Sequence, residues 1–289
     1  MAEFISQPKD PLLPFIAYGS FKPNELRYNQ IKDFVDSCEK IEITGEILDK
    51  DGIPIFVRES KYGVYYPYQA FVITFKKGRE EEAYEIICKN EPQTYYQWEV
   101  WDNRNLLTGK RHLRGTCNYP EYSWSFRDDP YFFEGLTAVD AISHVQIESS
   151  RPEHGHITEF FGVSSAYMLL WTIIERFCTL KYGNLKPTEK LKKLSEEPGL
   201  RNSLISVRNQ EDRPIVRSDS TGTKLGASQD GSNPLKTLNY YYGIRSNMVH
   251  RGKDAITDIG LIRSALYNVK KHFLDILITH DYRSEQYDQ

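Results

Sequence analysis

The sequence predicts an α+β protein in which a small N-terminal domain, a mixed β-barrel or sheet, is followed by an all-α helical bundle. Three observations lead to this fold class. The chain has 289 residues, which suggests two domains at roughly 150 residues each. Short strand-like runs bounded by turn residues fill the first half, whereas residues spaced for buried helix faces fill the second. We therefore expect the domains to span residues 1–150 and 151–289.

The first half contains strand-like runs that end at Gly, Asp or Ser turns. These runs cover residues 12–18, 41–48, 65–75 and 95–101. One helix is expected over residues 79–89, because three glutamates in its first turn suit the positive end of the helix dipole and apolar residues follow on one face. The aromatic segment 119–133 is expected to be a peripheral loop with short strands.

In the second half, apolar residues recur at intervals of three and four, which is the spacing of a buried helix face. The helices expected on this basis cover residues 163–180, 188–194, 234–249 and 256–277. They form a domain of about four helices. The segment 217–233 is rich in Ser, Gly and Asp and predicts a loop, and its glycine spacing does not match a phosphate-binding Walker A sequence.

The composition excludes several classes of protein. The hydrophobic fraction is 39% and the charged fraction 27%, which is too apolar for a disordered chain and too polar for a membrane bundle. The longest apolar stretch, residues 166–174, is about half as long as a bilayer span, and no basic segment followed by an apolar one opens the chain. The four cysteines are scattered without the spacing of zinc ligands. We expect a cytoplasmic protein with reduced thiols, no metal, no cofactor and no membrane partner.

The net charge of −3 is divided unevenly along the chain. Residues 1–156 carry 18 Lys and Arg against 25 Asp and Glu, and the remaining residues carry 19 against 15, so the two parts have net charges of −7 and +4. A basic second half permits binding to nucleic acid, although a mixed solvated surface gives the same count.

The first candidate site is a strand that runs directly into a Gly-Ser turn. At Tyr18, Gly19, Ser20 and Phe21, such a turn can direct backbone N–H groups into one pocket, where they bind a carboxylate or an oxyanion. Glu91 follows the predicted helix, a position that an ordinary helix-end carboxylate also occupies. The Gly-Ser residues likewise fit an ordinary turn that ends a strand.

With these residues, the first half resembles the gamma-glutamylcyclotransferase-like family, including its AIG2-like branch. The resemblance covers residues 14–102. It rests on the Tyr-Gly-Ser turn, on a Gly-Glu-Ile-Leu strand at residues 45–48 followed by Asp-Gly-Ile-Pro, and on Glu91 followed by Tyr95.

The resemblance implies a substrate and a mechanism for this domain. The substrate is a γ-glutamyl compound, which the four turn residues bind. Glu91 shuttles a proton while the α-amino group of the substrate attacks its own γ-carbonyl, and 5-oxoproline is released. Two residues depart from the family pattern: Phe21 stands where a small aliphatic residue is commoner, and Pro92 constrains the backbone beside the acid–base residue.

The second candidate site lies at the end of the helix expected at residues 234–249. Arg245 and His250 form an Arg-x4-His motif. His exchanges protons near neutral pH and Arg supplies a fixed cation for the charge on a phosphorane, which are the two needs of metal-free RNA cleavage. Five residues turn a regular helix by about 140°, so the two side chains do not share a face, whereas Ser246 and His250 do. Either the helix end loosens or a second chain completes the site.

In this context the second half, over residues 157–280, resembles the HEPN superfamily in its Apea-like, ribonuclease-type form. The shared features are a first helix with Trp171 and Glu175, a penultimate helix that ends in Arg-x4-His and Arg-Gly, and a long last helix. The resemblance implies a metal-independent endoribonuclease with the arginine and the histidine as catalytic residues, and Glu175 as the residue that orients one of them. Members without catalysis use the same two residues to cap the helix and bind its neighbours.

Other polar residues surround the motif. Ser246 and Asn247 stand where the family often has Asn, Asp or His directly after the arginine, and they are further catalytic candidates. Arg251 and Lys253 are either RNA phosphate contacts or a solvated helix end. The three tyrosines at residues 240–242 can stack on bases, although at least one of them must pack inward on a helix.

These features give one leading hypothesis and two alternatives. The leading hypothesis is a metal-independent endoribonuclease that acts on RNA as a homodimer assembled through its helical domain. It would be a toxin or antiviral defence effector that the first domain restrains or targets. The first alternative places the chemistry at Glu91 and makes the helical domain an assembly device. The second has no catalysis and makes both domains binding modules.

Overall fold

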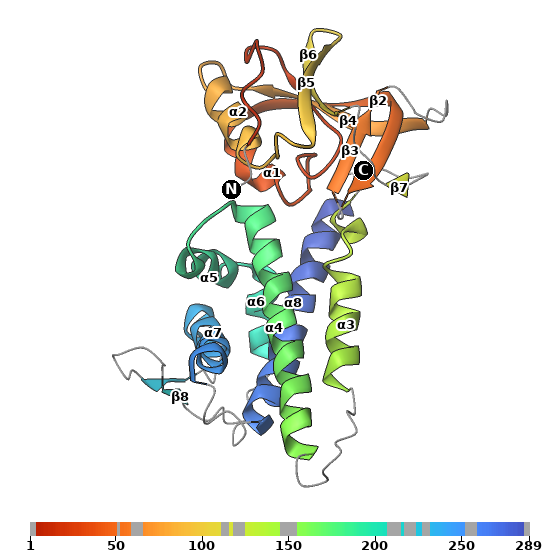
Figure 1. The fold of residues 1–289 in the computed structure, drawn as a ribbon. Helices are drawn as coiled ribbons and strands as arrows, with labels where there is room; N and C mark the ends of the chain where they lie inside the picture. The colour runs from red at the N-terminus through yellow and green to blue at the C-terminus, as the bar shows by residue number, and fades with distance from the viewer. Residues whose placement is uncertain are drawn as a thin grey trace. The chain divides into compact units, whose positions relative to one another are not determined.

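The computed structural model describes residues 4–50, 53–58, 66–110, 116–117, 125–144, 155–206, 215–216, 224–226, 232–251 and 259–285. The chain divides into two compact units, the first made of Met1–Pro130 with Leu180–Gly183 and the second of Tyr131–Thr179 with Asn184–Gln289. The first unit contains a mixed sheet and the second is helical (Figure 1), which confirms the α+β class. Most of the predicted loop at 217–233 lies outside the described residues.

The first unit is built on a sheet with the strand order β3-β2-β4-β1-β6-β5, and β7 pairs with β2 outside this path. The strands are β1 (Phe15–Ala17), β2 (Val35–Lys50), β3 (Ile53–Val57), β4 (Tyr66–Phe75), β5 (Tyr96–Trp101), β6 (Arg104–Gly109) and β7 (Thr116–Cys117). β1 pairs in parallel with β6, while the other described pairs of this sheet are antiparallel. The four predicted strands are therefore confirmed, β2 is longer than expected, and β3, β6 and β7 were not expected.

β1 lies in the interior of the sheet and sends alternate side chains to opposite faces. Phe15 and Ala17 belong to the apolar cluster that includes Tyr84 of helix α2 (Glu80–Cys88), whereas Ile16 and Tyr18 belong to the cluster on the other face. The predicted helix at 79–89 is thus confirmed. Because both neighbours of β1 are strands, the turn that follows Ala17 begins inside the unit and not at its edge. The connection to β2 holds α1 (Tyr28–Ile31) and a 3-10 helix (Lys32–Phe34).

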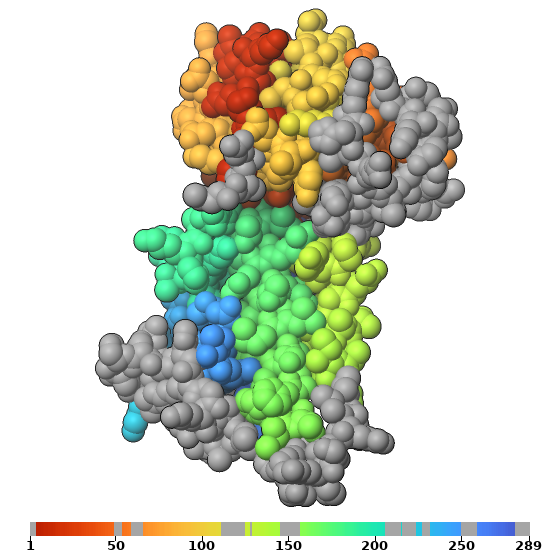
Figure 2. All heavy atoms as spheres, in the orientation of Figure 1, coloured from red at the N-terminus to blue at the C-terminus, as the bar shows by residue number. Residues whose placement is uncertain are grey.

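The second unit contains six described helices. They are α3 (Phe133–Ser143), α4 (Gly155–Tyr182), α5 (Pro187–Ser195), α6 (Pro198–Ser206), α7 (Pro234–Arg251) and α8 (Ile259–Glu285). A short hairpin pairs β8 (Ile215–Val216) with β9 (Lys224–Leu225), and a 3-10 helix (Phe126–Asp128) precedes α3. α3 lies beside α4 (Figures 1 and 2), and the ring of Phe132, the residue before α3, packs edge to face against Phe177 of α4.

Two helices, α3 and α6, are corrections to the expected four. The helix expected over residues 188–194 is α5, and a further helix, α6, begins at Pro198, because a first helical residue needs no N–H partner. Gly199 lets α6 approach α8 closely, since an added Cβ would lie 2.5 Å from the carbonyl oxygen of Asp275. α3 follows the aromatic segment, so the compact helical unit begins at Tyr131, whereas the sequence places the boundary after residue 150.

α4 is the one described helix that is long and apolar enough to cross a membrane, judged by length and composition alone, over Ile157–Tyr182. The stretch at residues 166–174 that the sequence singled out is only its central part. Leu170, Ile173 and Phe177 are buried within the unit, as the apolar face of a core helix is.

Candidate functional site

A pocket opens at the end of β1 in the first unit. Its enclosed cavity is small, about 20 Å³, which is room for about one water molecule. The pocket opens toward solvent, and its lining is Phe15, Ala17, Tyr18, Gly19, Ser20, Phe21, Pro54, Glu91, Tyr96 and Leu107. All five residues that the sequence proposed for this domain, the four turn residues and the glutamate, therefore lie around one cavity. Sequence reasoning did not include Pro54 and Tyr96 as site residues.

The turn after β1 is held by its own backbone. Lys22 N–H donates to Gly19 O at 2.9 Å, and Arg27 N–H donates to Ser20 O at 3.0 Å. Within the described part of the chain, the N–H groups of Gly19, Ser20 and Phe21 meet no acceptor. Three consecutive N–H groups without a partner are suited to an anionic or carbonyl oxygen of a bound molecule.

Gly19 is required by close packing. A Cβ atom at this position would lie 2.8 Å from Cγ of Pro54, which is shorter than ordinary van der Waals contact. Pro54 belongs to β3, and its carbonyl oxygen accepts a hydrogen bond from the Tyr96 hydroxyl at 3.2 Å. The turn, β3 and β5 thus meet at the pocket.

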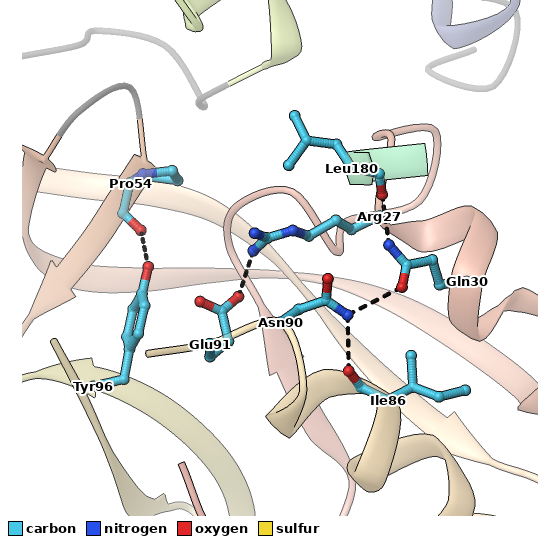
Figure 3. A network of polar contacts seen from close by, with 8 residues as sticks. All are labelled: Arg27, Gln30, Pro54, Ile86, Asn90, Glu91, Tyr96 and Leu180. Atoms are coloured by element: carbon cyan, nitrogen blue, oxygen red, sulfur yellow. Dashed lines mark hydrogen bonds and ion pairs between the residues drawn. The ribbon is translucent and has the colours of Figure 1, made fainter. Parts of the chain in front are cut away.

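Glu91 brings a carboxylate to the pocket from the segment after α2. Glu91 N–H donates to Cys88 O at 3.2 Å and Ile5 N–H donates to Glu91 O at 3.1 Å, which fixes its backbone. The residue is only 4% exposed. Its Oε1 lies 2.7 Å from Nη1 of Arg27 (Figure 3), while its buried Oε2 has no hydrogen-bond partner among the residues that the structure describes.

Burial dominates the acid–base properties of the pocket. It raises the pKa of Glu91 to about 7, although Arg27 and the nearby Tyr96 hydroxyl both lower it. Burial also raises the pKa of Tyr18 and the pKa of Tyr96, so both phenols stay neutral. Glu91 is therefore the group of this pocket that can exchange a proton near neutral pH.

Arg27 is the functional candidate that the sequence analysis missed. Its side chain is buried and its guanidinium lies 5.7 Å from the centroid of the Phe21 ring. Nothing in the sequence around it distinguishes it from a surface arginine, because its partner is 64 positions away along the chain.

The second unit brings together part of the other predicted site. Arg245 on α7 forms an ion pair with Glu175 on α4, with 3.4 Å between Nη2 and Oε1. Its Nη1 also donates to the Tyr242 hydroxyl at 3.2 Å, and the Tyr242 ring packs edge-on against Trp171 with 5.2 Å between ring centroids. Tyr241, like the residue before it, is buried, which confirms that at least one tyrosine of residues 240–242 packs inward.

The rest of the Arg-x4-His motif is only partly described. α7 remains helical through Arg251, so the offset of about 140° between Arg245 and His250 persists and the helix end does not loosen. Ser246 and Asn247 are partly buried on this helix. The side chains of His250 and Arg251, and the whole of Lys253, lie outside the described residues.

No family model, curated protein or solved structure matches this chain. The fold and the two sites define its class as an α+β protein with a carboxylate pocket in its sheet unit and an Arg–Glu pair in its helical unit. Its function is therefore argued from these two sites.

Proposed function

We propose that the first unit is an acid–base catalyst of the gamma-glutamylcyclotransferase type, which converts a γ-glutamyl compound to 5-oxoproline. The observation that supports this most is Glu91, whose carboxylate lines the pocket with one oxygen unpaired and whose pKa is raised by burial to about 7. A helix-end carboxylate with no function is normally solvated, whereas burial of this one carries a free-energy cost that a catalytic role explains.

The reaction balances without water or a cofactor. Glu91 Oε2 takes a proton from the α-ammonium group of the substrate, and the freed amine nitrogen attacks the γ-carbonyl carbon. The new C–N bond closes the five-membered ring, and Glu91 passes its proton to the nitrogen of the leaving amine as the γ-amide C–N bond breaks. The ring nitrogen then loses its second proton, which Glu91 takes and passes to the released amine, so that the products are 5-oxoproline and an ammonium ion. The N–H groups of Gly19, Ser20 and Phe21 offer donors to the oxygen that gains charge or to the substrate carboxylate.

This proposal is tested by assaying the full chain with a panel of γ-glutamyl amino acids, peptides and amines and measuring 5-oxoproline. Glu91→Gln should lower kcat by at least about 100-fold, the usual contribution of a general acid–base group. Glu81→Gln, which removes an exposed carboxylate of α2, is the matched control and should retain full activity. Absence of turnover across the panel, or equal rates in the two variants, would show that the pocket does not perform this reaction.

A second function is favoured by the ion pair between Arg245 and Glu175, which joins two helices that the sequence separates by 70 positions. We propose that the second unit is a metal-independent endoribonuclease of HEPN type. The Arg245 side chain is 27% exposed and can reach a phosphate, and His250 would transfer protons to and from the 2′-hydroxyl and the leaving oxygen. In this proposal the protein acts as a toxin or defence effector, and the first unit restrains or targets it.

The ribonuclease proposal predicts products that end in 2′,3′-cyclic phosphate, because the neighbouring 2′-hydroxyl is the nucleophile. Cleavage of RNA should persist in EDTA and should be lost in Arg245→Ala and His250→Ala, and expression of the wild type should halt growth in a way that His250→Ala relieves. Lys236→Ala, at an exposed position of the same helix, is the control that should cleave normally. Loss of activity in EDTA, or equal cleavage of DNA, would contradict the mechanism.

A further inference from the structure

We infer that Arg27 is the positioning residue of the Glu91 pocket, which holds one oxygen of the carboxylate and leaves the other to the bound molecule. The contact between Arg27 and Glu91 does not depend on any proposed function. Only its effect on turnover rests on the cyclotransferase function proposed above.

Arg27 contacts one of the two carboxylate oxygens of Glu91. Nη1 of Arg27 lies 2.7 Å from Oε1 of Glu91, and both side chains are at most 10% exposed. Within the described part of the chain, neither Oε2 of Glu91 nor Nε of Arg27 has a hydrogen-bond partner. The arginine therefore contacts a single oxygen and does not form the paired, two-bond arrangement typical of Arg with a carboxylate.

Arg27 also connects the carboxylate to the turn that carries the free N–H groups. Its backbone N–H donates to Ser20 O at 3.0 Å, and the ring of Phe21 lies beneath its guanidinium at 5.7 Å. A cation placed over an aromatic ring is held by the charge distribution of that ring. The departure from the family pattern at Phe21 thus has a physical role, which is to support Arg27.

The unpaired Oε2 indicates what the bound molecule must offer. A buried carboxylate oxygen without a hydrogen bond destabilises the pocket, and an N–H or O–H group of a ligand would remove that penalty. Because Arg27 occupies Oε1, the ligand donor is directed to Oε2. The acceptor group of the same ligand is then left for the N–H groups of residues 19–21.

Arg27 also controls the charge of Glu91. The titratable groups that face the carboxylate are Arg27, Tyr96, Tyr18 and Cys88, and among these described groups Arg27 is the cation. Its charge lowers the pKa of Glu91 against the larger effect of burial. Without that charge, the effect of burial on the carboxylate is no longer offset by Arg27. The pKa of Glu91 should then rise above its wild-type value of about 7.

The test is a direct titration of the Glu91 carboxyl carbon by NMR in the full chain labelled with ¹³C-glutamate, with Glu91→Gln used to assign the signal. Arg27→Met should raise the titration midpoint by about one pH unit or more, and Arg27→Lys, which keeps the charge, should return it toward the wild-type value. Arg79→Met, an exposed arginine of the same unit paired with Glu82, should leave it unchanged. If Arg27→Met does not fold, Arg27→Gln provides a second neutral variant.

An unchanged or lower midpoint in the neutral Arg27 variants would overturn the inference. The titration needs no substrate, so it can succeed even if the protein releases no 5-oxoproline, in which case only the cyclotransferase proposal fails. Where turnover is observed, the acid limb of its pH profile should move to higher pH in Arg27→Met by the same amount as the NMR midpoint. A merely structural arginine would lower activity without that shift.

Discussion

If the first unit is the proposed cyclotransferase, the ionisation of the single residue Glu91 determines the pH at which it can release 5-oxoproline. Only the ionised carboxylate accepts a proton, and burial places its pKa at about 7. We therefore expect kcat/KM for 5-oxoproline release to increase with pH through an apparent pKa near 7 and to level off above it. Measurement of kcat/KM from about pH 5 to 9 checks this, and an acid limb near the ordinary glutamate pKa of 4.5 would show that Glu91 is not the base or is not buried in solution.

Gly19 gives a second prediction at this scale. In Gly19→Ala the new Cβ meets the Pro54 ring at 2.8 Å, so either the turn or β3 must shift. Overpacking of this kind costs about 1–3 kcal/mol, and the shift should also abolish ligand binding in the pocket. Thermal unfolding and 5-oxoproline release check both effects.

The control for this prediction is Gly260→Ala in α8, where no described atom lies within 4 Å of an added Cβ. This variant should be as stable as the wild type or slightly more so, because alanine favours the helix. A Gly19→Ala protein with unaltered stability and turnover would mean that the turn does not pack against Pro54.

The site residues could be predicted from the sequence only where a local pattern marks them. Tyr18, Gly19 and Glu91 belong to recognisable short motifs, and the structure brings them together. Arg27 and Tyr96 carry no such pattern. Their roles arise from tertiary approach between segments far apart in the chain, which neither spacing nor hydrophobic periodicity encodes.

At the scale of elements, buried polar contacts join α6 to α8. Ser203 Oγ lies 2.8 Å from Nδ1 of the buried His272, and burial lowers the pKa of His272 to about 4, against a smaller opposite effect of Asp275. At this histidine the folded state therefore binds fewer protons than the unfolded state, in which the pKa of the side chain is 6.5. By linkage, stability should be highest above pH 6.5 and should be lost as the pH falls toward 4.

The size of this effect can be measured by urea denaturation. When the pH is lowered from about 6.5 to 4.5, the free energy of unfolding of the wild type should fall by about 2 kcal/mol more than that of His272→Asn, because asparagine cannot be protonated. The difference between the two proteins isolates this histidine from other titrating groups, including Glu91. If the free energy of unfolding depends on pH in the same way in the wild type and in His272→Asn, then His272 is accessible to solvent or protonated in the folded protein.

The elements that the sequence missed have identifiable causes. β6 follows β5 through Asp102 and Asn103, which both have positive φ angles of 49° and 56°, the conformation of a tight two-residue hairpin turn. That Asp-Asn pair is a signal that could have been recognised. α6 was missed because Pro198 ends one helical pattern and begins another, and sequence periodicity cannot separate these two roles.

At the scale of the whole molecule, the ribonuclease proposal requires a homodimer with two Arg245/His250 helix ends facing each other. The regular helix splays these two side chains, so a second copy is needed to place two histidines and two arginines around one RNA strand. Of the apolar residues beside the motif, Ile244 is buried in its own unit, but Met248 is partly exposed and Val249 is 55% exposed.

Light scattering should therefore report about twice the chain mass of 33.7 kDa. A charge introduced by Met248→Glu should lower the dimer fraction and RNA cleavage together, because burial of a carboxylate in an interface is unfavourable. Ile205→Glu, at an exposed apolar position of α6, serves as the control and should affect neither. A fully active monomer would refute the shared site.

We propose that 5-oxoproline release takes place at the Glu91 pocket of the first unit and does not require the arginine site of the second. The most direct test is the rate of 5-oxoproline release from a γ-glutamyl substrate by wild type, Glu91→Gln and Arg245→Ala, measured on the full chain under identical conditions. Wild type and Arg245→Ala should release 5-oxoproline at the same rate, and Glu91→Gln should release essentially none. Release by Glu91→Gln at the wild-type rate, or no release by the wild type, would contradict this proposal.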